Sequence, residues 1–232
     1  MNHSAQRRVG VIALAIGSLL ITGCASGAPP QAAQSPTPVV EPGTARRSPS
    51  PSPTPTERRA PSDLSLDHGA DLDPSEWRVQ WFTFGDGFSE LSPDDGNGSW
   101  SITDDATQCE ISFYQGTLAG IDYSQDDRTI TNELLTLMVG AISAGATRED
   151  VESHAFDDAV PLFFDDDVLP MRTIWGGQAD GGTWLFSARM FGSMGGGIYL
   201  MINCPEGQDA MEEYNTLRDD EHLVVDVGPG ST

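Results

Sequence analysis

Few of the side chains that carry catalytic chemistry are present in this chain of 232 residues. All 12 basic residues are arginine, which excludes mechanisms that need a lysine amine. A zinc protease needs two histidines one helical turn apart with a Glu between them, whereas His68, His154 and His222 are scattered. The stretch Gly192–Gly195 has neither the spacing of a serine-nucleophile turn nor the lysine of a phosphate loop. We therefore predict no catalytic residue, no metal and no cofactor.

Carboxylates are the exception, with 35 Asp and Glu residues and a formal net charge of −23. Glycoside hydrolysis needs only two of them, ~5 to 9 Å apart, so a secreted hydrolase of wall glycan is the alternative function. The run Asp165, Asp166 and Asp167 is a weak candidate for calcium, which prefers oxygen ligands, against the simpler interpretation of solvated surface acid. Because binding to nucleic acid depends on basic residues that neutralise phosphate, this acidity argues against nucleic acid as a partner.

Two cysteines, Cys109 and Cys204, lie beyond residue 62. Both fall in expected strands of a chain that carries an export signal, described below. An even pair of cysteines in an oxidising compartment favours a disulfide over two free thiols. On the loop-entropy model the bridge contributes at most ~4.5 kcal/mol to stability. We predict a structural disulfide, which leaves neither thiol available for nucleophilic chemistry.

Tryptophan offers another route to ligand binding, because flat aromatic faces pack on sugars. All five tryptophans lie at or after Trp77, and large aromatic residues in strands more often belong to the core. Trp100 and Trp175 stand next to glycine-rich or serine-rich stretches, so they are the two that we expect to be exposed. They are weak candidates for ligand binding, and the sequence does not name the ligand.

The first 24 residues have the features of a lipoprotein export signal. Arg7 and Arg8 precede the apolar run Val9–Ile21, which is too short for the ~20 residues that span a bilayer. The run ends in the sequence LITGC at Cys24, which resembles the lipobox of bacterial lipoproteins. The resemblance implies that residues 1–23 are a signal peptide and that Cys24 is lipidated, anchoring the chain to the extracytoplasmic face of the cell membrane. An ordinary signal peptide with a chance cysteine, and twin-arginine export in place of general secretion, are the alternatives.

Residues 24–62 follow as an expected linker. Ten of the 16 prolines lie in this stretch, which has no aromatic residue and alternates Ser or Thr with Pro from Ser48 to Thr56. Such a composition cannot bury enough apolar surface to offset the entropy of ordering, so we expect an extended, solvated tether. At ~3.1 Å per residue in the polyproline conformation it reaches at most ~120 Å, which is enough to hold a domain off the membrane.

Residues 63–232 are predicted to form one α+β domain. Strands are indicated by alternation of apolar and polar residues, and helices by apolar residues at helical intervals. The elements expected along the chain are strands Trp77–Trp81, Trp100–Thr103 and Gln108–Tyr114, a helix capped near Ser124 that ends at Gly145, a helix from Thr147 to about Phe156, strands Arg172–Trp175, Thr183–Phe191 and Ile198–Asn203, a helix that starts at Pro205, and a strand His222–Val227. Short glycine turns between the later strands favour an antiparallel β-sheet with helices packed on it, in the order βββααβββαβ.

This order, together with the lipobox and the proline-rich tether, resembles the PsbP-like lipoproteins of actinobacterial envelopes. The resemblance is topological and involves no shared motif, so no catalytic residue carries over from the family. It implies an accessory or ligand-binding protein. From the sequence we therefore expect a membrane-anchored, non-catalytic binding module with a glycan, lipid or protein partner in the envelope.

Overall fold

The computed structural model describes residues 63–83, 86–163 and 167–229, which belong to one of the two compact units into which the chain divides. These residues form nine strands and three helices. In chain order they are β1 (Trp77–Thr83), β2 (Phe88–Ser92), β3 (Ser99–Asp104), β4 (Glu110–Gly116), α1 (Asp127–Ile142), α2 (Arg148–His154), β5 (Phe156–Pro161), β6 (Val168–Gly177), β7 (Thr183–Phe191), β8 (Gly196–Cys204), α3 (Ala210–Asp219) and β9 (Leu223–Pro229).

Seven of the strands form one antiparallel sheet in the order β2-β3-β4-β8-β7-β6-β5. Strands β1 and β9 form a separate antiparallel pair, in which Trp77 lies opposite Pro229 and Thr83 lies opposite Leu223. Most neighbours in the large sheet are consecutive in sequence, and β4 beside β8 is the exception. The α+β class and the antiparallel sheet are as predicted.

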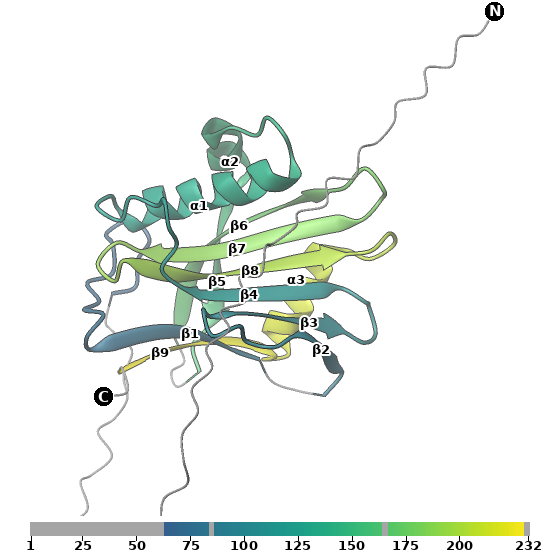
Figure 1. Ribbon diagram of the computed structural model, residues 1–232, viewed down its shortest axis with the longest axis horizontal. Coiled ribbons are helices and arrows are strands. Elements are labelled where there is room, and N and C mark those ends of the chain that lie inside the picture. The colour runs from purple at the N-terminus through teal and green to yellow at the C-terminus, as the bar shows by residue number, and fades with distance from the viewer. Residues whose placement is uncertain (1–62, 84–85, 164–166, 230–232) are drawn as a thin grey trace, which may run out of the picture. The chain divides into compact units, whose positions relative to one another are not determined.

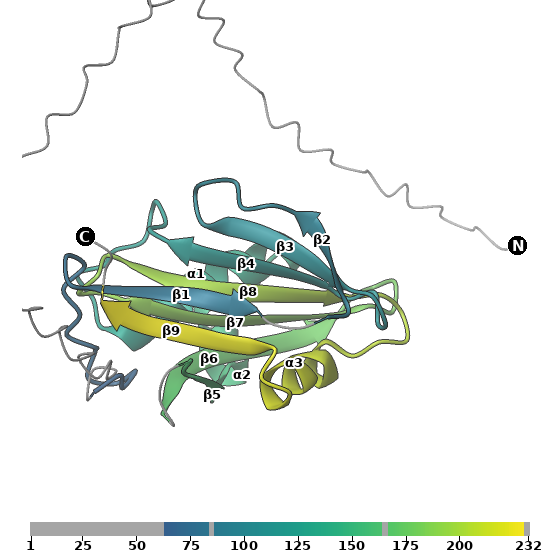
Figure 2. The same cartoon turned by 90° about the horizontal axis from the view of Figure 1, so that it is seen from below.

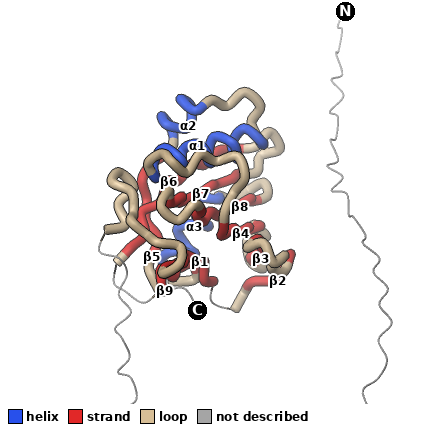
Figure 3. Tube along the Cα trace, turned by 60° about the vertical axis from the view of Figure 1, so that its left-hand side comes forward, coloured by secondary structure: helices blue, strands red, loops and turns tan. Residues whose placement is uncertain are grey.

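Helices α1 and α2 cover one face of the large sheet, and α3 and the β1–β9 pair lie on the other (Figures 1 and 2). Figure 3 shows the same separation from the side, with β6, β7 and β8 between the two layers. Strand β7 serves both layers: Phe186 and Met190 pack with Ile130 of α1, whereas Leu185 and Phe191 belong to the core under the other layer. Its alternating side chains therefore contribute to two separate cores.

Local capping signals set where α1 and α2 begin. The N-cap of α1 is Asp126, whose carboxylate accepts a hydrogen bond from the backbone N–H of Thr129 at 2.9 Å, and not Ser124 as predicted. The predicted capping box of α2 is confirmed, because Thr147 and Asp150 each accept a hydrogen bond from the other's backbone N–H. Among the described residues, no helix has the length and apolar character needed to cross a bilayer.

Several boundaries differ from the sequence predictions. Strands β2 and β5 are missing from the predicted order, and β2 is mostly exposed, so it lacks the alternation by which strands are recognised. Helix α2 ends at His154, earlier than predicted, because the backbone becomes extended there and Phe156 begins β5. Helix α3 begins at Ala210 behind the N-cap Asp209, and not at Pro205.

The predicted disulfide is confirmed between Cys109 and Cys204, whose Cα atoms are 4.2 Å apart. Cys109 lies directly before β4 and Cys204 ends β8, and these two strands are neighbours in the sheet. The bridge therefore fixes the end of β8 from which the chain continues into α3.

Candidate functional site

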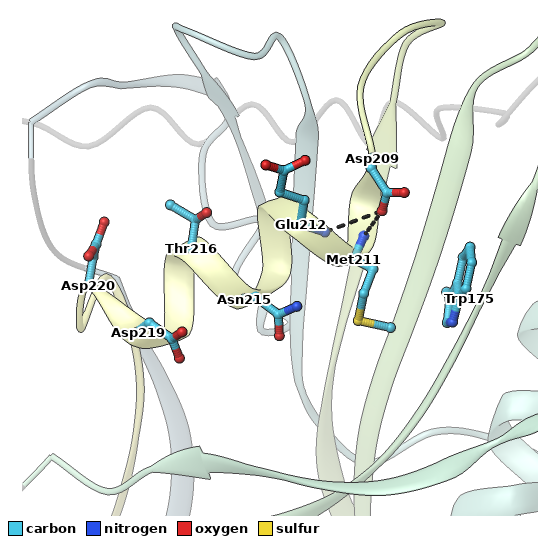
Figure 4. A pocket seen from close by; sticks show the side chains of 8 residues that line it. All are labelled: Trp175, Asp209, Met211, Glu212, Asn215, Thr216, Asp219 and Asp220. Carbon is cyan, nitrogen blue, oxygen red and sulfur yellow. Dashed lines mark hydrogen bonds between the residues drawn. The ribbon is translucent and has the colours of Figure 1, made fainter.

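A groove of about 600 Å³ lies along helix α3 and reaches strand β6 (Figure 4). Trp175 and Met211 lie at one end of it, and Asp219 and Asp220 lie at the other end of the helix (Figure 4). The lining combines one aromatic ring, one thioether and several carboxylates, namely Trp175, Asp209, Met211, Glu212, Asn215, Thr216, Asp219 and Asp220. We call this surface the α3 groove.

Helix α3 leaves polar side chains in the groove because its opposite face is buried. Ala210, Tyr214 and Leu217 are buried, at the spacing of one stripe along a helix. Glu212 and Thr216 are exposed and project to the same side of the helix (Figure 4). The amphipathic pattern that docks α3 on the sheet therefore also sets which carboxylates face solvent.

The start of α3 is fixed by two short polar side chains. Asp209 accepts hydrogen bonds from the backbone N–H groups of Met211 at 2.8 Å and Glu212 at 3.2 Å. Thr183 of β7 accepts a hydrogen bond from the N–H of Ala210 at 2.8 Å. Asp209 thus has a structural role, although it also lines the groove.

Trp175 is the exposed aromatic side chain of the groove, with 49% of its surface accessible. On one side it pairs with Leu185 of β7. On the other side, β5 begins at Phe156 opposite Thr173, so the pairing of β5 with β6 ends before Trp175. Trp175 therefore lies beyond the end of β5, and the exposure expected from the sequence is observed.

Trp100 behaves differently. It lies on β3 opposite Phe113 of β4, and the two rings stack with their centroids 5.1 Å apart. Trp100 is only partly exposed and packs against the core, so its expected exposure is not observed. Trp100 was a candidate for ligand binding because it was expected to be exposed, and the structure removes that reason.

The charged side chains that line the α3 groove are all acidic, and the arginine of α3 forms ion pairs with acids on β5 and on α3 itself. Arg218 donates a hydrogen bond to Asp158 of β5 at 2.7 Å and lies 3.4 Å from Asp219. The side chains of Glu212 and Asp220 are exposed and form no hydrogen bond or ion pair with another residue in the described part of the chain. These two carboxylates are therefore open to an external partner.

A second hollow, of about 540 Å³, lies on the opposite face of the sheet at the end of α1. Its aromatic and thioether groups are Trp184, Phe186 and Met201, and at its polar side Gln178 donates a hydrogen bond to Asn203. The one carboxylate in its lining, Asp180, already accepts a hydrogen bond from the backbone N–H of Gly182 in the turn between β6 and β7. Such a hollow suits the apolar part of a small ligand but offers little charge to orient it.

A buried ion pair links the beginning of the described chain to the sheet. Arg189 of β7 and Asp127 of α1 are both buried, and Nη2 lies 2.8 Å from Oδ2. Asp127 also accepts hydrogen bonds from the N–H groups of Ala70 at 3.0 Å and Gly192 at 2.9 Å, and Arg189 donates to the carbonyl of Ser65 at 3.0 Å. Burial lowers the pKa of Arg189 to about 10, so it remains charged at neutral pH.

Two further arginines form ion pairs nearby, one of them exposed in part and the other buried. Arg128 donates to Asp67 at 2.5 Å and, through both Nη atoms, to Asp157 at 2.8 Å. Arg172 donates to the same Asp157 at 2.8 Å. The hydrogen bonds from Arg128 and Arg172 lower the pKa of Asp157 to about 2. We call the group of Arg189, Asp127, Arg128, Asp157 and Arg172 the entry corner, because it holds the first described segment of the chain.

The hydrolase alternative needs paired carboxylates, and Glu213 of α3 lies beside Asp104 at the end of β3. Glu213 is buried; its burial raises its pKa, and the neighbouring Asp104 raises it further. Neither residue lines the α3 groove or the second hollow. The pair is therefore not part of either hollow, where a substrate would bind.

Several predicted sites lie wholly or partly outside the described residues. Cys24 lies outside them, as do Asp165 and Asp166 of the calcium candidate. Asp167 is described, and its backbone carbonyl accepts a hydrogen bond from the N–H of Leu162 at 3.1 Å. Within the described ranges, no three His, Cys, Asp or Glu side chains are grouped so that they could hold a metal.

Comparison with protein-family models, with curated proteins and with solved structures found no match to this chain.

Proposed function

We propose that this protein is a lipid-anchored envelope protein whose body is a non-catalytic binding module, and that the α3 groove is its binding surface. The observation that carries the proposal is the half-exposed Trp175 beside a row of exposed carboxylates on α3. The proposed partner is an extended, positively charged segment of another envelope protein. The anchor is the lipid expected on Cys24.

The chemistry of the groove supports a cationic partner. An indole face attracts guanidinium and ammonium groups, and the attraction is worth about 0.5 to 2 kcal/mol. Glu212 and Asp220 can pair with such groups without giving up an internal ion pair. Beyond residue 62 the chain carries six arginines against 33 carboxylates, so its field also speeds the approach of a basic partner.

Titration of hexa-arginine amide tests the binding surface. The protein is the chain from Cys24 onward with Cys24→Ser, which keeps it in solution, and binding is measured by calorimetry at low and high salt. We expect saturable binding that weakens with salt, and a loss of about tenfold in affinity for Trp175→Ala and for Glu212→Gln.

The matched control replaces two exposed carboxylates on other elements, Glu90→Gln with Glu149→Gln, and should change the affinity less than twofold. Equal binding by the wild type, Trp175→Ala and Glu212→Gln would remove the groove as the binding surface. Turnover of wall glycan by the same protein, abolished by Glu212→Gln or Glu213→Gln, would replace the proposal with the hydrolase.

A further inference from the structure

We propose that the second hollow binds the ring of a neutral sugar. The hollow lies on the face of the sheet that carries α1, whereas the α3 groove lies on the other face, so this inference does not rest on the proposed function. Its volume of about 540 Å³ falls in the range of small-molecule sites, ~300 to 1,000 Å³. A sugar ring has an apolar C–H face and an edge of hydroxyl groups, and the hollow has a matching surface for each.

The hollow opens where α1 ends above the sheet. Helix α1 begins beside the end of β7, where Asp127 accepts a hydrogen bond from the N–H of Gly192. It ends at Ile142, and both Ile142 and Ser143 line the hollow. Two rows of paired residues cross β6, β7 and β8 on this face: Ile174, Phe186 and Met201, and then Gly176, Trp184 and Asn203. The hollow is thus bounded by a helix end and by strand residues in fixed register, so it is already formed without a ligand.

Gly176 allows the indole of Trp184 to lie against the sheet. A Cβ atom at Gly176 would stand 2.6 Å from Cζ2 and 3.0 Å from Cε2 of the indole, well inside the ~3.5 Å at which carbon atoms pack. The ring therefore lies across the backbone of β6, with the ring of Phe186 beside it at a centroid distance of 5.3 Å. Trp184 is half-buried, and its exposed side borders the hollow. It offers a fixed aromatic surface for the apolar face of a sugar.

Two neutral amides form the polar edge of the hollow. Gln178 Nε2 donates a hydrogen bond to Asn203 Oδ1, and the backbone N–H of Gln178 donates to the carbonyl of Gly182 at 2.7 Å. Within the described part of the chain, Gln178 Oε1 and Asn203 Nδ2 have no hydrogen-bond partner. The pair therefore leaves one acceptor and one donor available. Adjacent sugar hydroxyls can satisfy both, because each hydroxyl donates and accepts.

The charge in the hollow favours a neutral ligand. An anion would find no cation among the described residues that line the hollow, and a cation would find one carboxylate, Asp180. One oxygen of Asp180 accepts a hydrogen bond from the N–H of Gly182 at 3.1 Å, so the other can accept from a sugar hydroxyl. An alkyl chain would cover Gln178 and Asn203 without giving their amides a partner, which is unfavourable. A ligand with both an apolar face and uncharged hydroxyls avoids each of these costs.

Titration with neutral disaccharides tests the inference. The probes are maltose, cellobiose and N,N′-diacetylchitobiose, added at up to about 20 mM to the Cys24→Ser chain, which detects dissociation constants in the millimolar range. Binding is followed in ¹H–¹⁵N spectra. We expect saturable binding of at least one sugar, with shifts of the indole N–H signal of Trp184 and of the side-chain amide signals of Gln178 and Asn203.

Variants of the two amides measure how much the polar edge contributes. Gln178→Ala with Asn203→Ala should weaken the binding at least about tenfold, because two hydrogen bonds to the sugar are lost. Both side chains reach the surface, so the fold should persist even if Trp184→Ala, which removes a ring packed on Phe186, disturbs it. The matched control is Gln208→Ala, an exposed amide that lines neither this hollow nor the α3 groove, and it should change the affinity less than twofold.

Three outcomes would overturn the inference. The first is no saturable binding of any of the three sugars. The second is equal affinity of the wild type and the Gln178→Ala/Asn203→Ala variant. The third is sugar binding that is lost in Trp175→Ala and kept in the amide variant, which would place the sugar in the α3 groove. Hexa-arginine amide, titrated into the same proteins, reports on the α3 groove separately, so none of these outcomes decides the proposed function.

Discussion

The entry corner and the α3 groove use charge in opposite ways. In the corner, Arg189, Arg128 and Arg172 each hold a carboxylate, and one of these pairs is buried. In the groove, Glu212 and Asp220 face solvent without an ion pair to another described residue. The chain has few basic residues, and it places half of the six arginines of its described part in the corner. The acids that serve structure in the corner thereby differ from Glu212 and Asp220, which a partner can use.

Physical chemistry explains this distribution. A buried charge must be paired, since removing its partner leaves an ion in a medium that cannot solvate it. An exposed carboxylate is solvated by water and gains little stability from a pair. The arginines are therefore needed where residues 63–72 join the core, and the surface of α3 can remain acidic at little cost in stability.

The largest effect expected concerns the support of the groove. Replacing both bridged cysteines, Cys109→Ala with Cys204→Ala, should lower the free energy of unfolding by up to ~4.5 kcal/mol, because the unfolded chain loses its cross-link. Urea unfolding of the two proteins measures the difference. A loss below about 1 kcal/mol would show that the bridge adds little, and that packing alone holds the end of β8 and the start of α3.

Next in size is the effect at the entry corner. Arg189→Met should destabilise the protein by about 3 to 4 kcal/mol, since Asp127 is left buried without its cation. The matched control is Arg148→Met, which removes an exposed ion pair to Glu152 on α2 and should cost less than about 0.5 kcal/mol. Equal losses in urea unfolding would mean that burial does not distinguish the corner from the surface.

A smaller effect depends on pH and concerns Asp157. Its pKa in the folded protein is about 2, below its ordinary value of 3.8, so its ion pairs stabilise the fold above pH 3.8 and this contribution is lost as the pH falls towards 2. The free energy of unfolding of the wild type should therefore exceed that of Asp157→Asn at pH 6, and the difference should shrink between pH 4 and pH 2. A difference that stays constant over this range contradicts the assignment.

Much of the fold could be predicted because burial imposes periodic patterns on the sequence. Strand β8 alternates buried and partly exposed residues, and only two cysteines lie beyond residue 62 to form the disulfide. Strand β2 is exposed and leaves no such pattern. Arg189 interrupts an apolar strand, which could have indicated a buried ion pair, but 33 carboxylates were candidates for its partner. The exposure of Trp175 depends on where β5 begins, and β5 is missing from the order predicted from the sequence.

The central claim is that Glu212 and Asp220, two exposed acids of the α3 groove, serve binding and not stability. It is tested most directly by measuring both quantities on one variant, Glu212→Gln with Asp220→Asn, using urea unfolding and titration with hexa-arginine amide. We expect a free energy of unfolding within about 0.5 kcal/mol of the wild type, together with at least about tenfold weaker binding. A variant that loses more than about 2 kcal/mol of stability, or that binds the peptide as tightly as the wild type, would contradict the claim.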